Sequence, residues 1–213
     1  MAGKNTNEVR LGAPQQVGGY GRYAPMSTPR PKDAATPLDA AYIDFGYISE
    51  DGVEVITDSG SDKIKDWDQG TVAIIQKSNE CSVKFTLLQI SPQTARLMFG
   101  ANNVETTGTG DAEMVTAIHY TGKLLKSSQF AFLMEDTNGP MILDVADGTV
   151  TGFKGFKFKK TEVIAFEVEL ELRKDKLSRF FSLWTSNTPG TTTNPIDATG
   201  GTPGGTVVIN TGV

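Results

Sequence analysis

The segment 162–173 constrains the fold more than any other part of the chain. Its apolar residues alternate with polar or small ones, and the apolar set is Ile164, Phe166, Val168, Leu170 and Leu172. Successive side chains of a β-strand point to opposite faces, so this pattern predicts a strand with one face in a hydrophobic core. The opposite face carries Glu167, Glu169 and Glu171. The sequence therefore predicts a sheet that is apolar on one side and acidic on the other.

Apolar runs and turn signals between residues 42 and 185 predict further strands. We expect them at 42–48, 53–56, 71–76, 81–89, 113–120, 128–135, 140–145, 149–159, 162–173 and 177–184. Tight turns are expected at four dipeptides, because glycine and asparagine accept the positive φ that such turns need: Asp51-Gly52, Ser78-Asn79, Asn138-Gly139 and Asp147-Gly148. Many short strands joined by turns predict a mainly β fold, a sandwich or a barrel.

One short helix is expected beside this sheet. Ser91 is a suitable N-cap, and Pro92 suits the first helical position. Ala95, Leu97 and the residues around them supply an apolar face, and Gly100 ends the helix. The sequence thus predicts one short α-helix that flanks the strands.

The two ends of the chain have a different composition from its middle. Residues 1–41 are rich in glycine and proline, with apolar residues at intervals, among them Val9, Leu11, Tyr20 and Tyr23. Such a segment is either an arm that orders on a partner or a disordered leader. Residues 186–213 are rich in Thr, Gly and Pro and predict a flexible tail. We therefore divide the chain into an N-terminal arm, 1–41, a β domain, 42–185, and a C-terminal tail, 186–213.

The stretch Thr57–Gly70 is a long polar excursion that also contains Ile64 and Trp67. A tryptophan is costly to leave in water and is frequent at the centre of protein interfaces. Trp67 therefore either folds back on its own sheet or is buried against a neighbouring molecule. Both remain open from the residues alone.

Charge and motif content argue against DNA gripping and against catalysis. The net charge of −5 is opposite to that of proteins that hold DNA phosphates tightly. The chain has one histidine, His119, and one cysteine, Cys81, which we expect to be a buried apolar residue beside Val83. Phosphate-loop, nucleophile-elbow and zinc-protease motifs do not occur. We expect no enzyme activity, no cofactor and no metal.

No stretch of the sequence approaches the roughly 18 apolar residues of a membrane span, and the N-terminus lacks a signal-peptide pattern. We therefore expect a protein that is made in the cytoplasm and does not contact a membrane.

Several blocks of residues resemble the major tail tube proteins of long-tailed, siphovirus-type phages, especially those of actinobacterial hosts. The central block is Asp44-Phe-Gly-Tyr-Ile-Ser-Glu-Asp-Gly-Val53. The others are Gly21–Pro25, Ala35–Ala41, Asp62–Trp67, Thr71-Val72, Phe85–Leu88, Thr94–Gly100 and Asn103-Val104. Together the blocks cover most of residues 20–105.

The resemblance implies a structural virion protein whose hexameric rings stack into a tube through which DNA passes without specific binding. It implies assembly in the host cytoplasm, with a tape measure protein and tail terminator and tip proteins as partners. Residues 1–41 and Thr57–Gly70 would contact neighbouring subunits, and the expected contact residues are Tyr20, Tyr23, Tyr47, Ile64 and Trp67. Glu167, Glu169 and Glu171 would either line the bore or form an ordinary solvated face.

Two other functions remain open on the residues alone. A β-barrel module that binds a small ligand would be a stable monomer with a deep apolar pocket. A capsid decoration protein or adhesin subunit would also suit the Thr/Gly/Pro-rich tail.

Overall fold

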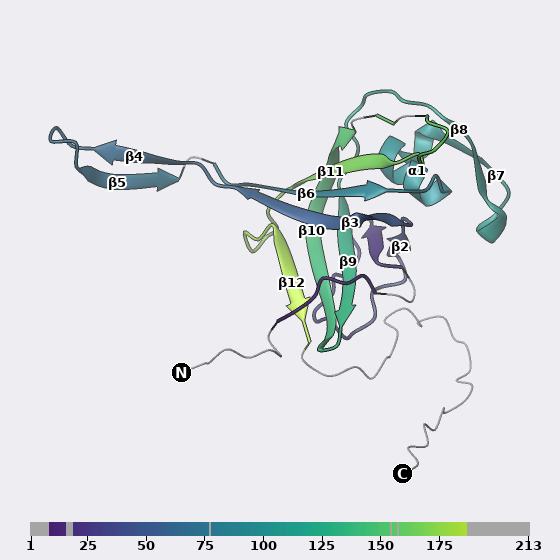
Figure 1. The fold of residues 1–213 in the computed structure, drawn as a ribbon, viewed down its shortest axis with the longest axis horizontal. Coiled ribbons are helices and arrows are strands. Elements are labelled where there is room, and N and C mark those ends of the chain that lie inside the picture. The colour runs from purple at the N-terminus through teal and green to yellow at the C-terminus, as the bar shows by residue number, and fades with distance from the viewer. Residues whose placement is uncertain (1–8, 16–18, 77, 154, 157, 187–213) are drawn as a thin grey trace, which may run out of the picture.

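The computed structural model describes residues 9–15, 19–76, 78–153, 155–156 and 158–186 (Figure 1). An antiparallel sheet in the order β2-β1-β9-β10-β11-β6-β3 forms the body, and β12 pairs with β10. Its strands are β1 (Gly21–Ala24), β2 (Ile43–Asp44), β3 (Ile48–Asp58), β6 (Glu80–Leu87), β9 (Ser128–Asp136), β10 (Gly139–Phe153), β11 (Phe166–Leu172) and β12 (Phe181–Thr185). The prediction of a mainly β protein is confirmed.

Two smaller sheets and short helices complete the described chain. The small sheets pair β4 (Ser61–Lys65) with β5 (Thr71–Gln76), and β7 (Val104–Thr107) with β8 (Met114–Ile118). The helix α1 (Pro92–Phe99) is followed by two 3-10 turns, Ala101–Asn103 and Gly110–Ala112. Within the described residues α1 is the only α-helix, as the sequence predicted.

The main core lies between two parts of the large sheet. In Figure 1, β3, β6 and β11 cross β9 and β10 at a steep angle, and the side chains between the two sets are buried. At its centre the Phe45 ring is stacked on Phe85, with ring centroids 5.4 Å apart, and Phe132 meets Phe85 edge to face. Cys81 is buried there beside Val83, as predicted, and burial raises the pKa of its thiol.

A second core covers the other face of β9 and β10. It joins Ala131, Leu133 and Ile142 from these strands to residues of the N-terminal region, namely Ala24, Ala34, Leu38 and Tyr42. Strand β1 is itself paired with β9, from Gly21↔Phe132 to Ala24↔Gln129. Residues 21–41 are therefore packed on their own domain, and the boundary that the sequence suggested at residue 41 does not coincide with a break in the packing.

The helix α1 begins and ends at the predicted residues. The Ser91 hydroxyl accepts a hydrogen bond from the Thr94 N–H at 3.1 Å, Pro92 opens the helix, and Gly100 caps its end. Thr94 Oγ1 then donates to the Phe45 carbonyl at 2.6 Å, which ties the helix to the main core. The Ser91 cap thus fixes the start of α1, and the Thr94 hydroxyl fixes its position against the sheet.

Three of the four predicted turns are wrong. Gly52 lies inside the continuous strand β3, where the pairing with β6 shifts between Ile48 and Val53. Gly52 has a positive φ of 73°, which a bulge requires just as a tight turn does. Gly148 lies inside β10 at another register shift, and a Cβ on it would lie 3.0 Å from the Phe130 ring. Glycine is needed there for close packing rather than for chain reversal.

The third wrong turn is Ser78-Asn79, which as a tight turn would pair the strands 71–76 and 81–89. Strand β5 pairs with β4, from Ser61↔Gln76 to Lys65↔Thr71, whereas β6 pairs with β3 and β11. The Asn138-Gly139 turn is confirmed, because Asp136 and Gly139 close the β9–β10 hairpin. The expected strand 149–159 ends at Phe153, and the expected strand 162–173 begins only at Phe166.

Candidate assembly interface

The β4–β5 hairpin projects far from the body of the molecule (Figure 1). It continues the β3–β6 pair outward, since β3 leads into β4 and β5 leads back into β6. Every residue of both hairpin strands is exposed. An isolated two-stranded hairpin is marginally stable in water, so this extension lacks the support that the other strands have.

Apolar side chains occupy both faces of this hairpin. The register pairs Ile64 with Ala73 and Asp62 with Ile75, which places Ile64, Ala73 and Ile75 on one face. Ile74 lies opposite Lys63 on the other face, together with Val72. Exposed large apolar residues grouped in this way mark an interaction surface.

The tip of the hairpin presents Trp67 to solvent. The Asp66 N–H donates to the Gly70 carbonyl at 2.9 Å, and the Gly70 N–H donates to Asp66 Oδ1 at 2.6 Å. This closed turn leaves the Trp67 side chain fully exposed, at 103% of its reference area. The structure therefore excludes, for the single chain, the alternative in which Trp67 folds back on its own sheet.

The tyrosines predicted as contacts fall into two groups. Tyr47 is 66% exposed, as a contact residue would be in the free subunit. Tyr20 and Tyr23 are half-buried in their own chain: the Tyr20 hydroxyl accepts from the Ile48 N–H at 3.0 Å, and Tyr23 is packed on the main core. The structure thus brings Ile64 and Trp67 together on the hairpin but leaves the three tyrosines on the body.

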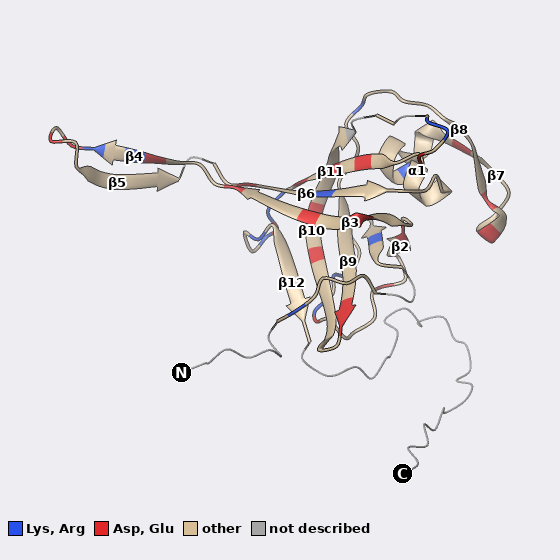
Figure 2. Ribbon diagram, in the orientation of Figure 1, with Lys and Arg blue, Asp and Glu red and all other residues tan. Residues whose placement is uncertain are grey.

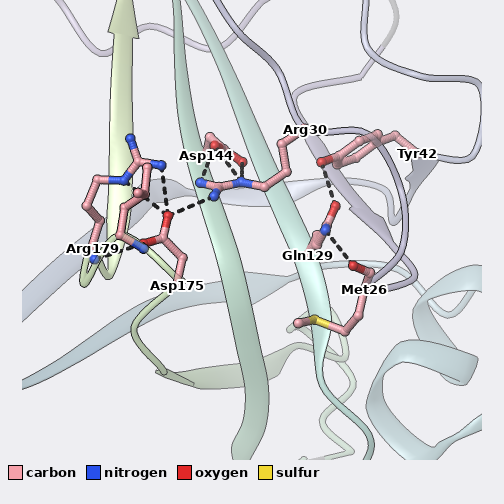
Figure 3. A network of polar contacts seen from close by, with 8 residues as sticks. Met26, Arg30, Tyr42, Gln129, Asp144, Asp175 and Arg179 are labelled. Carbon is pink, nitrogen blue, oxygen red and sulfur yellow. Dashed lines mark hydrogen bonds and ion pairs between the residues drawn. The ribbon is translucent and has the colours of Figure 1, made fainter.

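An ion-pair network fastens the N-terminal region to the sheet (Figure 3). Arg30 Nη2 donates to Asp144 Oδ2 at 2.6 Å, and its Nη1 donates to Asp175 Oδ2 at 3.0 Å. Arg179 Nη2 also donates to Asp175, at 2.8 Å. Asp144 is completely buried; burial raises the pKa of this carboxyl, and the Arg30 guanidinium opposes that rise.

Two further contacts hold the same region in place. The Tyr42 hydroxyl donates to Gln129 Oε1 at 3.2 Å, and Gln129 Nε2 donates to the Met26 carbonyl at 2.9 Å (Figure 3). Burial raises the pKa of Tyr42. Nearer the N-terminus, Arg10 Nε donates to Asp136 Oδ2 at 2.9 Å. The described part of the predicted arm is therefore anchored to its own domain at several points.

One face of the β3–β6–β11 sheet is acidic. Glu167, Glu169 and Glu171 point away from the core, opposite Thr86, Lys84 and Ser82 of β6. Strand β3 and the start of β6 add Glu54, Asp58 and Glu80 to the same face. We call the group Glu54, Asp58, Glu80, Glu167, Glu169 and Glu171 the acidic face.

One lysine interrupts the acidic face. Lys84 Nζ lies 3.2 Å from Glu169 Oε1, and both side chains are more than a third exposed, so the pair contributes little to stability. A shallow depression of about 510 Å³ runs across this face past Gly52 and Thr86. In Figure 2 the acidic residues of β3, β6 and β11 gather where the three strands run side by side. The predicted alternation of core and acid along 166–172 is confirmed.

Nothing in the described residues assembles a reactive centre. His119 is exposed, and its Nε2 lies 3.2 Å from Glu105 Oε1. Cys81, by contrast, is buried in the main core. Within the part of the chain that the structure describes, no group of three or more His, Cys, Asp or Glu residues is placed to hold a metal ion.

The helices that the structure describes include none long and apolar enough to cross a membrane.

Sequence reasoning missed Val72, Ile74 and Ile75 as surface residues. The run Thr71-Val-Ala-Ile-Ile-Gln76 predicts a strand, but not that its side chains are exposed. Its lack of alternation was the available signal, since a strand with one face in water alternates with polar residues.

Comparison with known proteins identifies the family. Residues 2–195 match a family model described as phage tail tube protein. No curated protein matches significantly.

Solved structures give distant likenesses. One is a chain of the virion of a native gene transfer agent particle, with TM-score 0.39 and 10% identity over 74% of this chain and 100% of that chain. Another is a chain of an extracellular contractile injection system, from its sheath–tube complex in the extended state, with TM-score 0.34 and 9% identity over 85% of this chain and 98% of the other. Because the family model spans most of the sequence, this chain belongs to the phage tail tube protein family, as a structural component of the virion tail.

Proposed function

We propose that copies of this protein join edge to edge into hexameric rings, which stack into a tube with the acidic face lining its bore. Double-stranded DNA passes through this bore without specific binding. The observation that carries the proposal is the separation of the two faces of one sheet. One face is the core of the subunit, and the other concentrates carboxylates with a single lysine among them.

The free edge of β3 supports ring closure. β3 ends the sheet order, so its outer side presents backbone N–H and C=O groups to solvent. A long exposed edge is a template for pairing with another chain, and a closed ring satisfies it without open-ended aggregation. Strand β2, at the other end of the sheet order, is only two residues long. In the proposed ring, β3 of one subunit extends the sheet of its neighbour at this end.

The charge of the acidic face supports passage rather than gripping. DNA-binding surfaces neutralise phosphates with lysine and arginine, whereas carboxylates repel them. A bore lined by Glu167, Glu169 and Glu171 therefore keeps the duplex from adhering to the wall.

Family membership and the lack of motifs also support a purely structural, non-enzymatic role with no cofactor. The proposal includes assembly in the host cytoplasm, with a tape measure protein in the bore and terminator and tip proteins at the tube ends. Contact of residues 1–41 with a neighbouring ring remains part of the proposal. The C-terminal tail, 186–213, lies almost entirely outside the described residues.

Site-specific labelling of assembled tubes tests the proposal. Electron microscopy of the concentrated protein first establishes whether tubes form. Glu171→Cys is then labelled with a small biotin-maleimide and probed with streptavidin, and Asp111→Cys, on the remote 3-10 turn, is the matched control. Native Cys81 is buried and should not interfere.

The two variants should behave differently if the acidic face lines the bore. In intact tubes both cysteines should react with the small reagent, but only the control should bind streptavidin along the tube wall. Streptavidin on the wall of Glu171→Cys tubes would place the acidic face outside and refute the lumen assignment. A protein that remains monomeric at all concentrations would refute the ring proposal.

A further inference from the structure

The body of the molecule contains an apolar groove at the end opposite the β4–β5 hairpin. It lies between α1, β8 and the segment that follows β10, with a volume of about 920 Å³. The side chains that line it include Ile90, Phe99, Met114, Tyr120, Phe156 and Phe158. Several are strongly exposed, with Met114 at 67% and Phe158 at 77%.

Aromatic packing gives the groove a defined wall. Phe156 meets Phe158 edge to face, with ring centroids 5.1 Å apart, and Phe156 also contacts Phe166 of β11 at 5.5 Å. Phe99 of α1 contacts Tyr120 at 6.4 Å on the other side. Such a ring-lined concavity suits a large flat side chain, because aromatic groups pack edge to face or offset.

The hairpin tip is the complementary convex feature on the same chain. Trp67 is fully exposed there, and the apolar faces of β4 and β5 lie directly behind it. Tryptophan is one of the residue types enriched among interface anchors, and such anchors fill pockets on the partner.

The positions of the two features decide which molecule can provide the partner. Figure 1 places the hairpin and the α1–β8 region at opposite ends of the longest axis, so one chain cannot dock its own hairpin into its own groove. Docking between copies is then head to tail. A docked pair keeps one unoccupied groove and one undocked hairpin, so further copies can add at either end. Head-to-tail contacts generate rings or helical stacks, which is the kind of symmetry that a tube needs.

Charges of opposite sign lie near the two features. Trp67 is flanked by Asp66 and Asp68, whereas Phe158, which lines the groove, is followed in the sequence by Lys159 and Lys160. Lys159 Nζ also lies 2.6 Å from Glu162 Oε1, and Glu113 is part of the groove lining. Opposite charges at the rim of an interface steer encounter and fix its register.

We propose that the β4–β5 hairpin of one copy docks into the apolar groove of a second copy, with Trp67 between Met114 and the Phe156–Phe158 pair. The inference rests on the proposed self-assembly and adds its acceptor site. It accounts for two exposed apolar surfaces of the free subunit with a single contact.

Disulfide trapping between two variants tests this pairing. One tagged variant carries Trp67→Cys and an untagged variant carries Met114→Cys; they are mixed above the raised assembly concentration expected for a variant without Trp67, assembled and oxidised. We expect a disulfide-linked heterodimer. The matched control replaces Met114→Cys by Leu177→Cys, an equally exposed leucine near β12 that is not part of the groove, and should give no heterodimer above background.

The outcomes separate this inference from the proposed function. Normal tubes without the Met114 crosslink would overturn the docking site and leave ring assembly intact. Failure of the unmodified protein to form tubes, with no crosslink, would overturn both. Binding of an apolar dye to the groove inside intact tubes would also overturn the docking site, because the groove would then be empty.

Assembly thresholds provide a second, independent readout. Trp67→Ala should raise the concentration needed for tube formation by about 30-fold, as expected for an interface anchor. The charge variant Asp66→Lys/Asp68→Lys should raise it less, and adding Lys159→Glu/Lys160→Glu in the same chain should partly restore it. If the lysine-to-glutamate changes did not restore assembly, the proposed approach of Asp66 and Asp68 to Lys159 and Lys160 would be contradicted.

Discussion

The strand pairs β3–β6 and β4–β5 are successive parts of one long hairpin, yet they differ in what covers them. Along β6, buried and partly exposed residues alternate strictly, and β3 follows with Val53 and Val55 against the main core. Along β4 and β5 every residue is exposed, although the apolar content is high. The inner half is therefore stabilised within the subunit, and the outer half has its apolar surface available for a neighbour.

Polar contacts differ between the two regions in the same way. In the body, the half-buried Arg30 forms an ion pair with the fully buried Asp144 and links residues 25–42 to β10. At the hairpin tip, the Asp66 side chain bonds only the nearby backbone of Gly70 among the hydrogen bonds that the structure describes. Changes in the body should thus alter the stability of the free subunit, whereas changes in the hairpin should not.

The largest effect is expected in the main core. Phe45→Ala removes a fully buried ring that contacts Phe85 and Phe132, and should lower the free energy of unfolding by about 3–5 kcal/mol. Urea unfolding of the dilute, unassembled protein, followed by tryptophan fluorescence and circular dichroism, measures the loss. A loss below about 1 kcal/mol would show that the body is not the stable part of the subunit.

Breaking the buried ion pair should come next. Arg30→Ala leaves the Asp144 carboxylate buried without its partner and should cost about 3 kcal/mol at neutral pH. Arg179→Ala, which removes a more exposed partner of Asp175, should cost less than about 1 kcal/mol. Equal losses would mean that burial of Asp144 does not decide the strength of the network.

The Arg30→Ala penalty should also depend on pH. Protonation neutralises the orphaned carboxylate of Asp144, so the difference from the unmodified protein should shrink in acid. Urea unfolding of both proteins over a series of pH values follows this change, and a penalty that grows in acid would contradict it.

A single backbone position inside β3 should give an intermediate effect. Gly52 has a φ of 73°, and the space around its would-be Cβ is open. Gly52→Ala should therefore cost only the conformational strain of a left-handed residue, about 1–2 kcal/mol. Thermal unfolding measures it. A loss as large as that of Phe45→Ala would indicate a clash that the bulge geometry does not contain.

Asp175 should make stability depend on pH at the acid end. Its bonds to Arg179 and then to Arg30 hold the pKa of this carboxyl well below its ordinary value of 3.8. The unfolded chain then binds more protons, so the stabilising contribution is complete above about pH 5 and declines as the pH falls below about 4. Unfolding of the unmodified protein and of Asp175→Asn should converge in this acid range; a constant difference would contradict the assignment.

The smallest effect on the free subunit is expected in the hairpin. Ile74→Ser and Trp67→Ala replace fully or largely exposed side chains and should change the free energy of unfolding by less than about 0.5 kcal/mol. The same urea titration measures both variants. A loss of several kcal/mol would show that the hairpin folds onto the body in solution, and would remove the contrast between the two regions.

Local patterns predicted those elements whose interactions are local. The prediction of a helix between Ser91 and Gly100 was correct because the capping residues directly flank the helix in the sequence. The pattern from Phe166 to Leu172 was correct because alternation follows from strand geometry. The Asp51-Gly52 turn was wrong because a glycine with positive φ serves a bulge as well as a turn. Only the partner strand, with its shift between Ile48 and Val53, decides between them.

The sequence by itself determined a mainly β protein with an acidic face, one short helix and a tail tube resemblance. The tertiary structure alone decided that β5 leaves the core, that residues 24–42 cover the second face of β9 and β10, and that a groove faces away from the hairpin. The physical reason is that alternation and capping depend on neighbours along the chain. Arg30 and Asp144, or Ile90 and Phe158, are instead brought together only when distant strands have paired.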